Sequence, residues 1–202
     1  MTITPPVLFV ETYVTLFFLL TPFFVLSAFL SMTRTMDMRA RRALSLRVTA
    51  AVAVAGCVLF LAGNTIFNLF GITLDAFRVG AGALLFLSAV GLVRGGKVET
   101  QAEEEGDISV VPLAIPITIG PATVGALLVM GAQLGTPFER GVAIGAFLAA
   151  SLSVGLMLLA ATSIERLVGR MGLSILSKLT GLILAALSAQ IVFTGVRGLL
   201  AT

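Results

Sequence analysis

The chain has 202 residues, of which 58% are hydrophobic and only 11% are charged, and its mean hydropathy is +1.10. Soluble domains have about a quarter of their residues charged, so a chain this apolar cannot cover its core with a polar surface, and a lipid bilayer is the solvent that fits it. One cysteine and no histidine exclude a disulfide framework and remove the commonest metal ligand.

Six apolar stretches follow one another along the chain, and each is long enough to cross a bilayer as a helix. Small residues are scattered through them without period-2 alternation, which favours helices over the strands of a barrel. The sequence therefore predicts an all-α membrane protein with six transmembrane helices. The stretches cover about residues 7–31, 46–70, 76–93, 110–134, 141–162 and 173–200.

The first span contains the dipeptide Thr21-Pro22 among phenylalanines. No Lys or Arg precedes it, so we expect this run to be retained as a span rather than cleaved as a signal peptide. A lone proline in a transmembrane helix usually introduces a kink. Glu11 lies close to the outer end of the same span, which weakens the argument for it as a proton carrier.

Asp75 and Arg78 lie three residues apart at the start of the third span, so they share one helix face. Two roles stay open for Arg78: an ion pair or an interfacial position at the helix end, or a bidentate contact with a bound carboxylate. After this span, residues 99–109 form an acidic polar stretch. We interpret it as a flexible cytoplasmic linker between a first unit, 1–98, and a second unit, 110–202.

The fourth span carries three prolines within ten residues: Pro112, Pro116 and Pro121, the last preceded by Gly120. Each proline removes a backbone hydrogen bond, so this spacing predicts a broken helix. The freed backbone groups cannot face lipid and must be met by protein, water or a solute. In secondary transporters such broken helices form the substrate site; the alternative is a structural kink whose polar groups are satisfied by neighbouring helices.

Gln190 lies deep in the sixth span, where either an interhelical hydrogen bond or a contact with a cavity would explain it. Together with the two proline segments and Arg78, it completes the candidate substrate-binding set. The set consists of Thr21, Pro22, Arg78, Pro116, Thr118, Gly120, Pro121, Ala122, Thr123 and Gln190.

The basic residues are distributed unequally between the connections. Ten of the 13 Lys and Arg residues fall in or beside the first, third and fifth connections, so these connections are expected in the cytoplasm and both termini on the periplasmic side. Because these residues lie between spans and not in one patch, we expect no nucleic-acid partner.

The two halves of the chain resemble each other. Shifted by 100 residues, Leu87-Ser88-Ala89 matches Leu187-Ser188-Ala189, and Pro22 precedes Pro121 by 99 residues. Two three-span halves must have opposite orientations, so the pattern predicts inverted repeats in which helices one and four are broken.

No motif of an enzyme is recognisable. The sequence has no P-loop, no H-E-x-x-H and no G-x-S-x-G. We therefore expect no enzymatic activity, no catalytic residues, no metal and no cofactor.

Several segments together resemble the MarC family of bacterial inner-membrane proteins: Leu19-Leu-Thr-Pro22, Phe70 through Gly82, Val111 through Pro121, and Leu179 through Ala186 with Gln190. The resemblance implies a six-helix inner-membrane protein grouped with transporters of small solutes, including small neutral amino acids. The family's first motif usually reads Asn-Pro or Asp-Pro, and here Thr21 takes that polar position. In the second motif, Ala122 replaces a usual glycine.

These observations lead to one main functional hypothesis and two alternatives. The main hypothesis is a secondary transporter that moves a small zwitterionic solute by alternating access and holds its carboxylate at the helix start after Gly120-Pro121. The alternatives are a non-transporting membrane protein that acts through helix–helix association, and a drug exporter. The expected partners are the lipid bilayer and the solute, while a homo-oligomer and proton coupling stay open.

Overall fold

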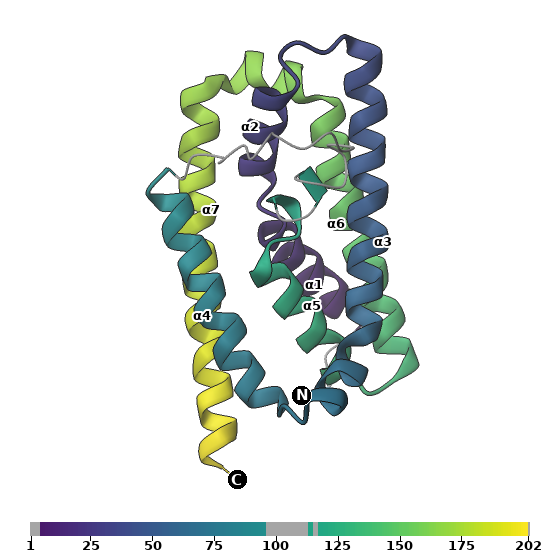
Figure 1. Cartoon of the computed structure of the whole chain (residues 1–202), viewed down its shortest axis with the longest axis vertical. Helices are drawn as coiled ribbons and strands as arrows, with labels where there is room; N and C mark the ends of the chain where they lie inside the picture. Colours follow the sequence, from purple (N-terminus) through teal and green to yellow (C-terminus); the bar gives the residue numbers. More distant parts are fainter. Residues whose placement is uncertain (1–4, 96–112, 115–116, 202) are drawn as a thin grey trace.

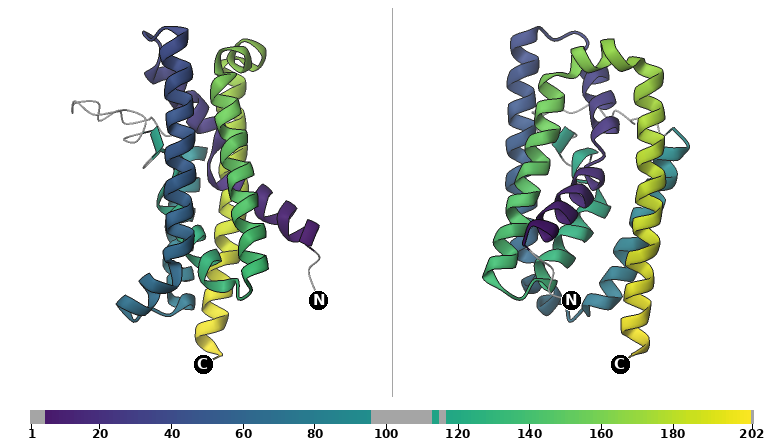
Figure 2. Two further views of the ribbon diagram at one scale, coloured as in Figure 1. Left: turned by 90° about the vertical axis from the view of Figure 1, so that its right-hand side faces the viewer. Right: turned by 180° about the vertical axis from the view of Figure 1, so that it is seen from behind.

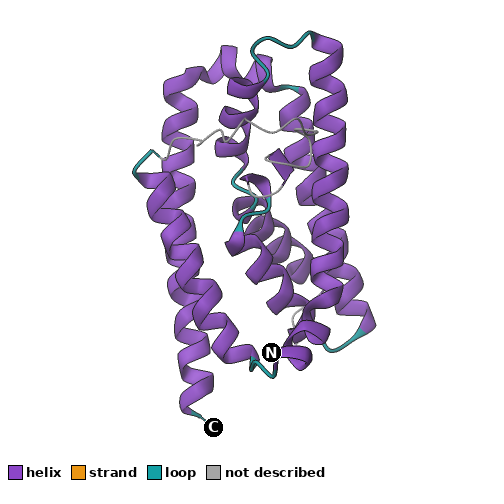
Figure 3. Cartoon of the chain, in the orientation of Figure 1, coloured by secondary structure: helices purple, strands orange, loops and turns teal. Residues whose placement is uncertain are grey.

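The computed structural model describes residues 5–95, 113–114 and 117–201, and within them it contains helices and turns but no strand (Figures 1 and 3). The all-α prediction is confirmed for this part of the chain. The helices are α1 (Pro5–Leu19), α2 (Pro22–Met32), α3 (Met38–Phe70), α4 (Leu74–Val93), α5 (Pro121–Gln133), α6 (Pro137–Leu159) and α7 (Ala161–Leu200).

Five helical stretches are long and apolar enough to cross a membrane, and a sixth, shorter one accompanies them. α1 and α2 together make the first stretch, while α5 is the short one because the fourth predicted span is interrupted before Pro121. The predicted linker at 99–109 lies outside the described residues.

Two helices begin earlier than hydropathy predicts, because hydropathy marks the apolar core of a span and not the end of its helix. α3 begins at Met38 and not near 46, since the Asp37 carboxylate accepts a hydrogen bond from the Ala40 amide at 2.8 Å and caps the helix. α7 begins at Ala161, and Gly169 (φ 71°, ψ 165°) separates its first turns from the long remainder.

The helices form two outer groups with the broken spans between them (Figure 1). α3 and α6 lie on one side and the closely packed pair α4 and α7 on the other, while α1, α2 and α5 lie in the middle. α1 packs mainly against α6, and α5 packs against both α3 and α4. The oblique course of α1 is clearest in the views of Figure 2.

Small residues bring α4 and α7 close together. A Cβ added at Gly82 would lie 2.6 Å from Val192, and one added at Gly181 would lie 2.9 Å from the Ala89 carbonyl oxygen. The buried Ser188 hydroxyl also donates to the Gly82 carbonyl at 2.8 Å. These contacts hold α4 and α7 together as one unit beside the broken helices.

The chain ends share one end of the bundle. The N- and C-termini lie there together with the turns after α3 and α5, whereas the α2–α3 connection and the start of α7 lie at the opposite end (Figures 1 and 2). This alternation is the one expected for consecutive membrane crossings.

Candidate functional site

The first span is broken at Thr21-Pro22, as the sequence predicts. α1 ends at Leu19 and α2 begins at Pro22, and Thr21 between them has the left-handed conformation with φ 46° and ψ 55°. Pro22 has no amide hydrogen, so the Phe18 carbonyl accepts from the Thr21 amide instead, at 3.0 Å. A β-branched residue is strained in this backbone region.

The fourth span is interrupted in a different way. The described residues before α5 form a wider π turn, in which the Ile119 amide donates to the Ala114 carbonyl at 2.8 Å. The buried Thr118 hydroxyl donates to the Leu113 carbonyl at 2.6 Å. Gly120 is the extended N-cap of α5, which begins at Pro121, whereas Pro116 lies outside the described residues.

One hydrogen bond joins the two breaks. The Thr123 hydroxyl, in the first turn of α5, donates to the carbonyl of Leu19, the last residue of α1, at 2.9 Å. Both side chains are almost fully buried. The proline at position 22 ends the helix that would have used this carbonyl, so a side chain 104 residues away replaces the lost backbone partner.

Each break also exposes the start of a helix. Neither Thr21 nor Gly120 provides a side-chain cap, and the second and third residues of each new helix are Phe23 and Phe24 in α2 and Ala122 and Thr123 in α5. Their amides have no hydrogen-bond acceptor among the described residues. Two helix N-termini with free donors, and the positive ends of their dipoles, therefore lie in the middle of the bundle.

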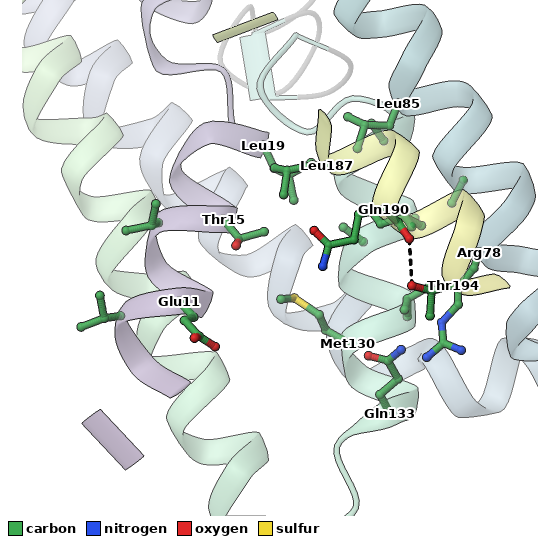
Figure 4. A pocket seen from close by; sticks show the side chains of 18 residues that line it. Glu11, Thr15, Leu19, Arg78, Leu85, Met130, Gln133, Leu187, Gln190 and Thr194 are labelled. Carbon is green, nitrogen blue, oxygen red and sulfur yellow. Dashed lines mark hydrogen bonds between the residues drawn. The ribbon is translucent and has the colours of Figure 1, made fainter. Parts of the chain in front are cut away.

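A cavity of about 750 Å³ extends from these breaks along α5 (Figure 4). Leu19 and Ala122 border its inner end, since they are the last residue of α1 and a first-turn residue of α5. Towards the chain termini, residues of α1, α4, α5 and α7 line it. We call it the α5 cavity, and its polar lining consists of Glu11, Thr15, Arg78, Gln133, Gln190 and Thr194.

Arg78 is held in place at the wall of the α5 cavity. Its guanidinium forms an ion pair with Asp75, and its Nε donates at 3.0 Å to the Gln133 side-chain oxygen when that amide is turned to satisfy both groups. Gly195 and Gly198 leave the room for this arrangement, because a Cβ at either position would meet Asp75 or Arg78. Of the two roles considered for Arg78, the ion pair is present; Arg78 also lines the cavity, and its contact with a bound carboxylate stays a prediction.

Glu11 and Gln190 face the α5 cavity without such partners. Figure 4 shows Glu11 on α1 across the cavity from Arg78, with Gln190 between them. No described residue forms an ion pair with Glu11 or a hydrogen bond with the Gln190 amide, while the Thr194 hydroxyl donates to the Gln190 backbone carbonyl at 2.8 Å. A carboxylate, an amide and the positive end of a helix dipole can together hold a solute that carries both charges.

Pro116 lies outside the described residues and Pro121 begins α5; the other eight residues of the predicted set divide into two groups. Arg78, Ala122 and Gln190 line the α5 cavity. Another group forms the breaks at its inner end without lining it: Thr21, Pro22, Thr118, Gly120 and Thr123. The hydroxyls of Thr118 and Thr123 donate to backbone carbonyls, which assigns them to the support of the breaks.

Sequence reasoning missed Thr15, Gln133 and Thr194 and gave Glu11 little weight. The available signal was Glu11 itself, a carboxylate within an apolar stretch. Among the described residues, no group of three or more His, Cys, Asp or Glu side chains could hold a metal ion.

Comparison with known proteins places these features in a family context. Residues 7–200 match the family described as MarC family integral membrane protein. A UPF0056 membrane protein of Methanocaldococcus jannaschii is 34% identical over 95% of this chain and 97% of its own length. The UPF0056 membrane protein YhcE of Escherichia coli is 30% identical over 96% of this chain and 94% of its own. No solved structure matches the chain.

Proposed function

Because the chain belongs to the MarC family of integral membrane proteins, we propose that it is a secondary transporter that moves small zwitterionic solutes by alternating access. Small neutral amino acids are the proposed substrates. The names of these relatives describe membrane proteins and do not name a substrate.

The observation that carries the proposal is the meeting of two proline-broken spans at the inner end of the α5 cavity. The Thr123–Leu19 hydrogen bond joins the breaks, and Leu19 and Ala122 border the cavity there. Irregular backbone at membrane depth is tolerated where it is buried in protein or lines a water-filled cavity. Substrate sites of secondary transporters are commonly built from discontinuous helices of this kind.

The chemistry of the α5 cavity fits a zwitterion. At the inner end, where Ala122 borders the cavity, the positive end of the α5 dipole favours a carboxylate. Nearer the chain termini, the unpaired Glu11 carboxylate offers a partner for an ammonium group. The volume of about 750 Å³ is within the usual range for small-molecule sites, roughly 300–1,000 Å³.

Contacts that recur at a shift of 99 residues support two inverted repeats, 1–98 and 110–202. Gly82 packs against Val192 of α7, and Gly181 packs against Val93 of α4. The two glycines are 99 residues apart and so are the two valines, so each contact is the counterpart of the other. Contacts between two units exchange in this way when the units are related by a two-fold axis.

A second correspondence lies at the ends of the short helices. The Arg41 Nε donates at 2.9 Å to the carbonyl of Thr33, the C-cap of α2, and the Arg140 Nε donates at 2.8 Å to the carbonyl of Leu134, the C-cap of α5. Arg41 and Arg140 are again 99 residues apart. Each short helix after a break is thus held at its far end by an arginine of the next helix.

We place the protein in a bacterial inner membrane with both termini in the periplasm. Arg34, Arg39, Arg41, Arg42 and Arg47 lie at the end of the bundle opposite to the termini, which the positive-inside rule assigns to the cytoplasm. In this orientation, the α5 cavity lies on the periplasmic side.

Counterflow of L-alanine and glycine in proteoliposomes tests the function. The wild-type protein is expected to exchange both above protein-free liposomes. Ala126→Leu adds bulk beside the α5 cavity and should lower the exchange, whereas Ala83→Leu on the exposed face of α4 should not. If the wild-type protein exchanges no small amino acid, the proposed function is wrong; if Ala126→Leu exchanges normally, the site is wrong.

A further inference from the structure

A second cavity, of about 470 Å³, lies between α2, α4 and α7. Phe24, in the first turn of α2, borders one end of it, and Arg34, just beyond the end of α2, borders the other. We call it the α2 cavity. It extends from the break in the first span towards the end of the bundle opposite to the α5 cavity.

The two cavities use corresponding faces of the two short helices. α2 faces its cavity with Ser27, Leu30, Ser31 and Arg34, and the residues that α5 turns to the other cavity lie 99 positions later. These are Ala126, Val129, Met130 and Gln133. Each cavity therefore begins at a proline break and follows the helix that starts there, and the two run in opposite directions.

About two turns of α4 separate the residues that border the two cavities. Leu85 borders the α5 cavity and Leu92 borders the α2 cavity, and seven residues of helix span about 10 Å. Ala89 lies between them and is fully buried, and the backbone of Gly181 on α7 packs against it. On α7, Leu184 lies between Ser177, which borders the α2 cavity, and Leu187, which borders the α5 cavity, and it is 1% exposed.

We propose that the α2 cavity is the cytoplasmic half of the solute path and that Arg34 receives the solute carboxylate there. This inference rests on the proposed transport function. Arg34 forms no ion pair with a described residue, and the serine hydroxyls of Ser27, Ser31 and Ser174 face the same space. At the edge of the cavity, Arg170 is paired with Glu165 at 2.9 Å.

The charges of the two cavities indicate the class of solute. The α5 cavity has an unpaired carboxylate, Glu11, and the α2 cavity has an unpaired guanidinium, Arg34. An anion would be repelled by the first and a cation by the second, since like charges repel. A solute with both charges and no net charge finds an opposite charge in each cavity.

Thiol modification within the α2 cavity tests the inference. In a Cys57→Ala background, Ser31→Cys protein in proteoliposomes is treated with a bulky, membrane-impermeant thiol reagent on both sides. L-Alanine exchange should fall by about tenfold or more, because the attached group fills a path of this size. Thr35→Cys is the matched control: it is exposed in the α2–α3 connection, outside the cavity, and its modification should leave exchange unchanged.

Two further outcomes overturn different statements. If the unmodified protein exchanges alanine and Ser31→Cys either resists the reagent or keeps its exchange rate after modification, the α2 cavity is not part of the path and only this inference fails. If the unmodified protein exchanges no solute, both the proposed function and this inference are wrong. Arg34→Gln should raise the KM for alanine, whereas Arg39→Gln at the start of α3 should not.

Discussion

Replacing Thr123 by valine removes the hydroxyl that joins the two broken spans but keeps the size of the side chain. The Leu19 carbonyl then loses its partner, in a residue that is only 3% exposed. Its usual helical partner is also absent, because α1 ends at this residue. We therefore expect Thr123→Val to destabilise the contact between α1 and α5.

The size of this destabilisation depends on whether the Leu19 carbonyl finds another hydrogen-bond donor. Side-chain hydrogen bonds between transmembrane helices contribute on average about 0.6 kcal/mol, since the alternative state finds other partners. A buried acceptor left without a partner costs about 1–3 kcal/mol, and that range applies to Leu19. For a chain of this length, about 2–4 °C in Tm corresponds to 1 kcal/mol, so we expect a loss of roughly 2–12 °C.

Thermal unfolding of the purified protein in detergent measures this loss. The chain has no tryptophan, so the circular dichroism of its helices is the suitable signal. Thr194→Val is the matched control, because the Thr194 hydroxyl bonds to a carbonyl of its own helix, that of Gln190, and Thr123→Ser should retain the bridge. If the Thr123→Val protein has the same Tm as the Thr194→Val protein, the reasoning is refuted.

Three further changes test other parts of the structure by the same melting assay. Thr21→Asn should raise Tm by about 2–4 °C, since Asn tolerates the left-handed conformation better than a β-branched residue, and a lower Tm would contradict the strain. Gly131→Ala should cost about 1–3 kcal/mol, because its Cβ would overlap a carbonyl oxygen of α3; Gly141→Ala, with no described atom within 4 Å of the new Cβ, is the control and should be neutral or stabilising. Arg140→Gln should lower Tm by about 3 °C or more through loss of the bond to Leu134, and an unchanged Tm would show that this bond adds nothing.

The positions of the breaks could be predicted from the sequence because proline acts locally. Pro22 and Pro121 each lack the amide hydrogen that a continuing helix needs, and the structure starts a new helix at both. Arg78 and Gln190 could also be singled out, since a polar group at membrane depth needs a partner or a cavity. Both line the α5 cavity.

The contacts between the breaks could not be predicted, because they depend on how distant segments pack. Nothing in the local sequence of Thr123 indicates that its hydroxyl bonds to a carbonyl 104 residues earlier. The sequence gives Glu11 little weight, because its place in a straight span puts it near the membrane surface. In the structure α1 is a short oblique helix, and Glu11 faces the α5 cavity.

The most direct test compares two neighbouring cysteines in α5, at Ala126 and Leu127, in a Cys57→Ala background. Ala126 borders the α5 cavity, whereas Leu127 is fully buried and does not. A membrane-impermeant thiol reagent should modify the Ala126→Cys protein much faster than the Leu127→Cys protein, and L-alanine should slow that reaction. Equally slow modification of both would show that the broken spans enclose no water-accessible site for a solute.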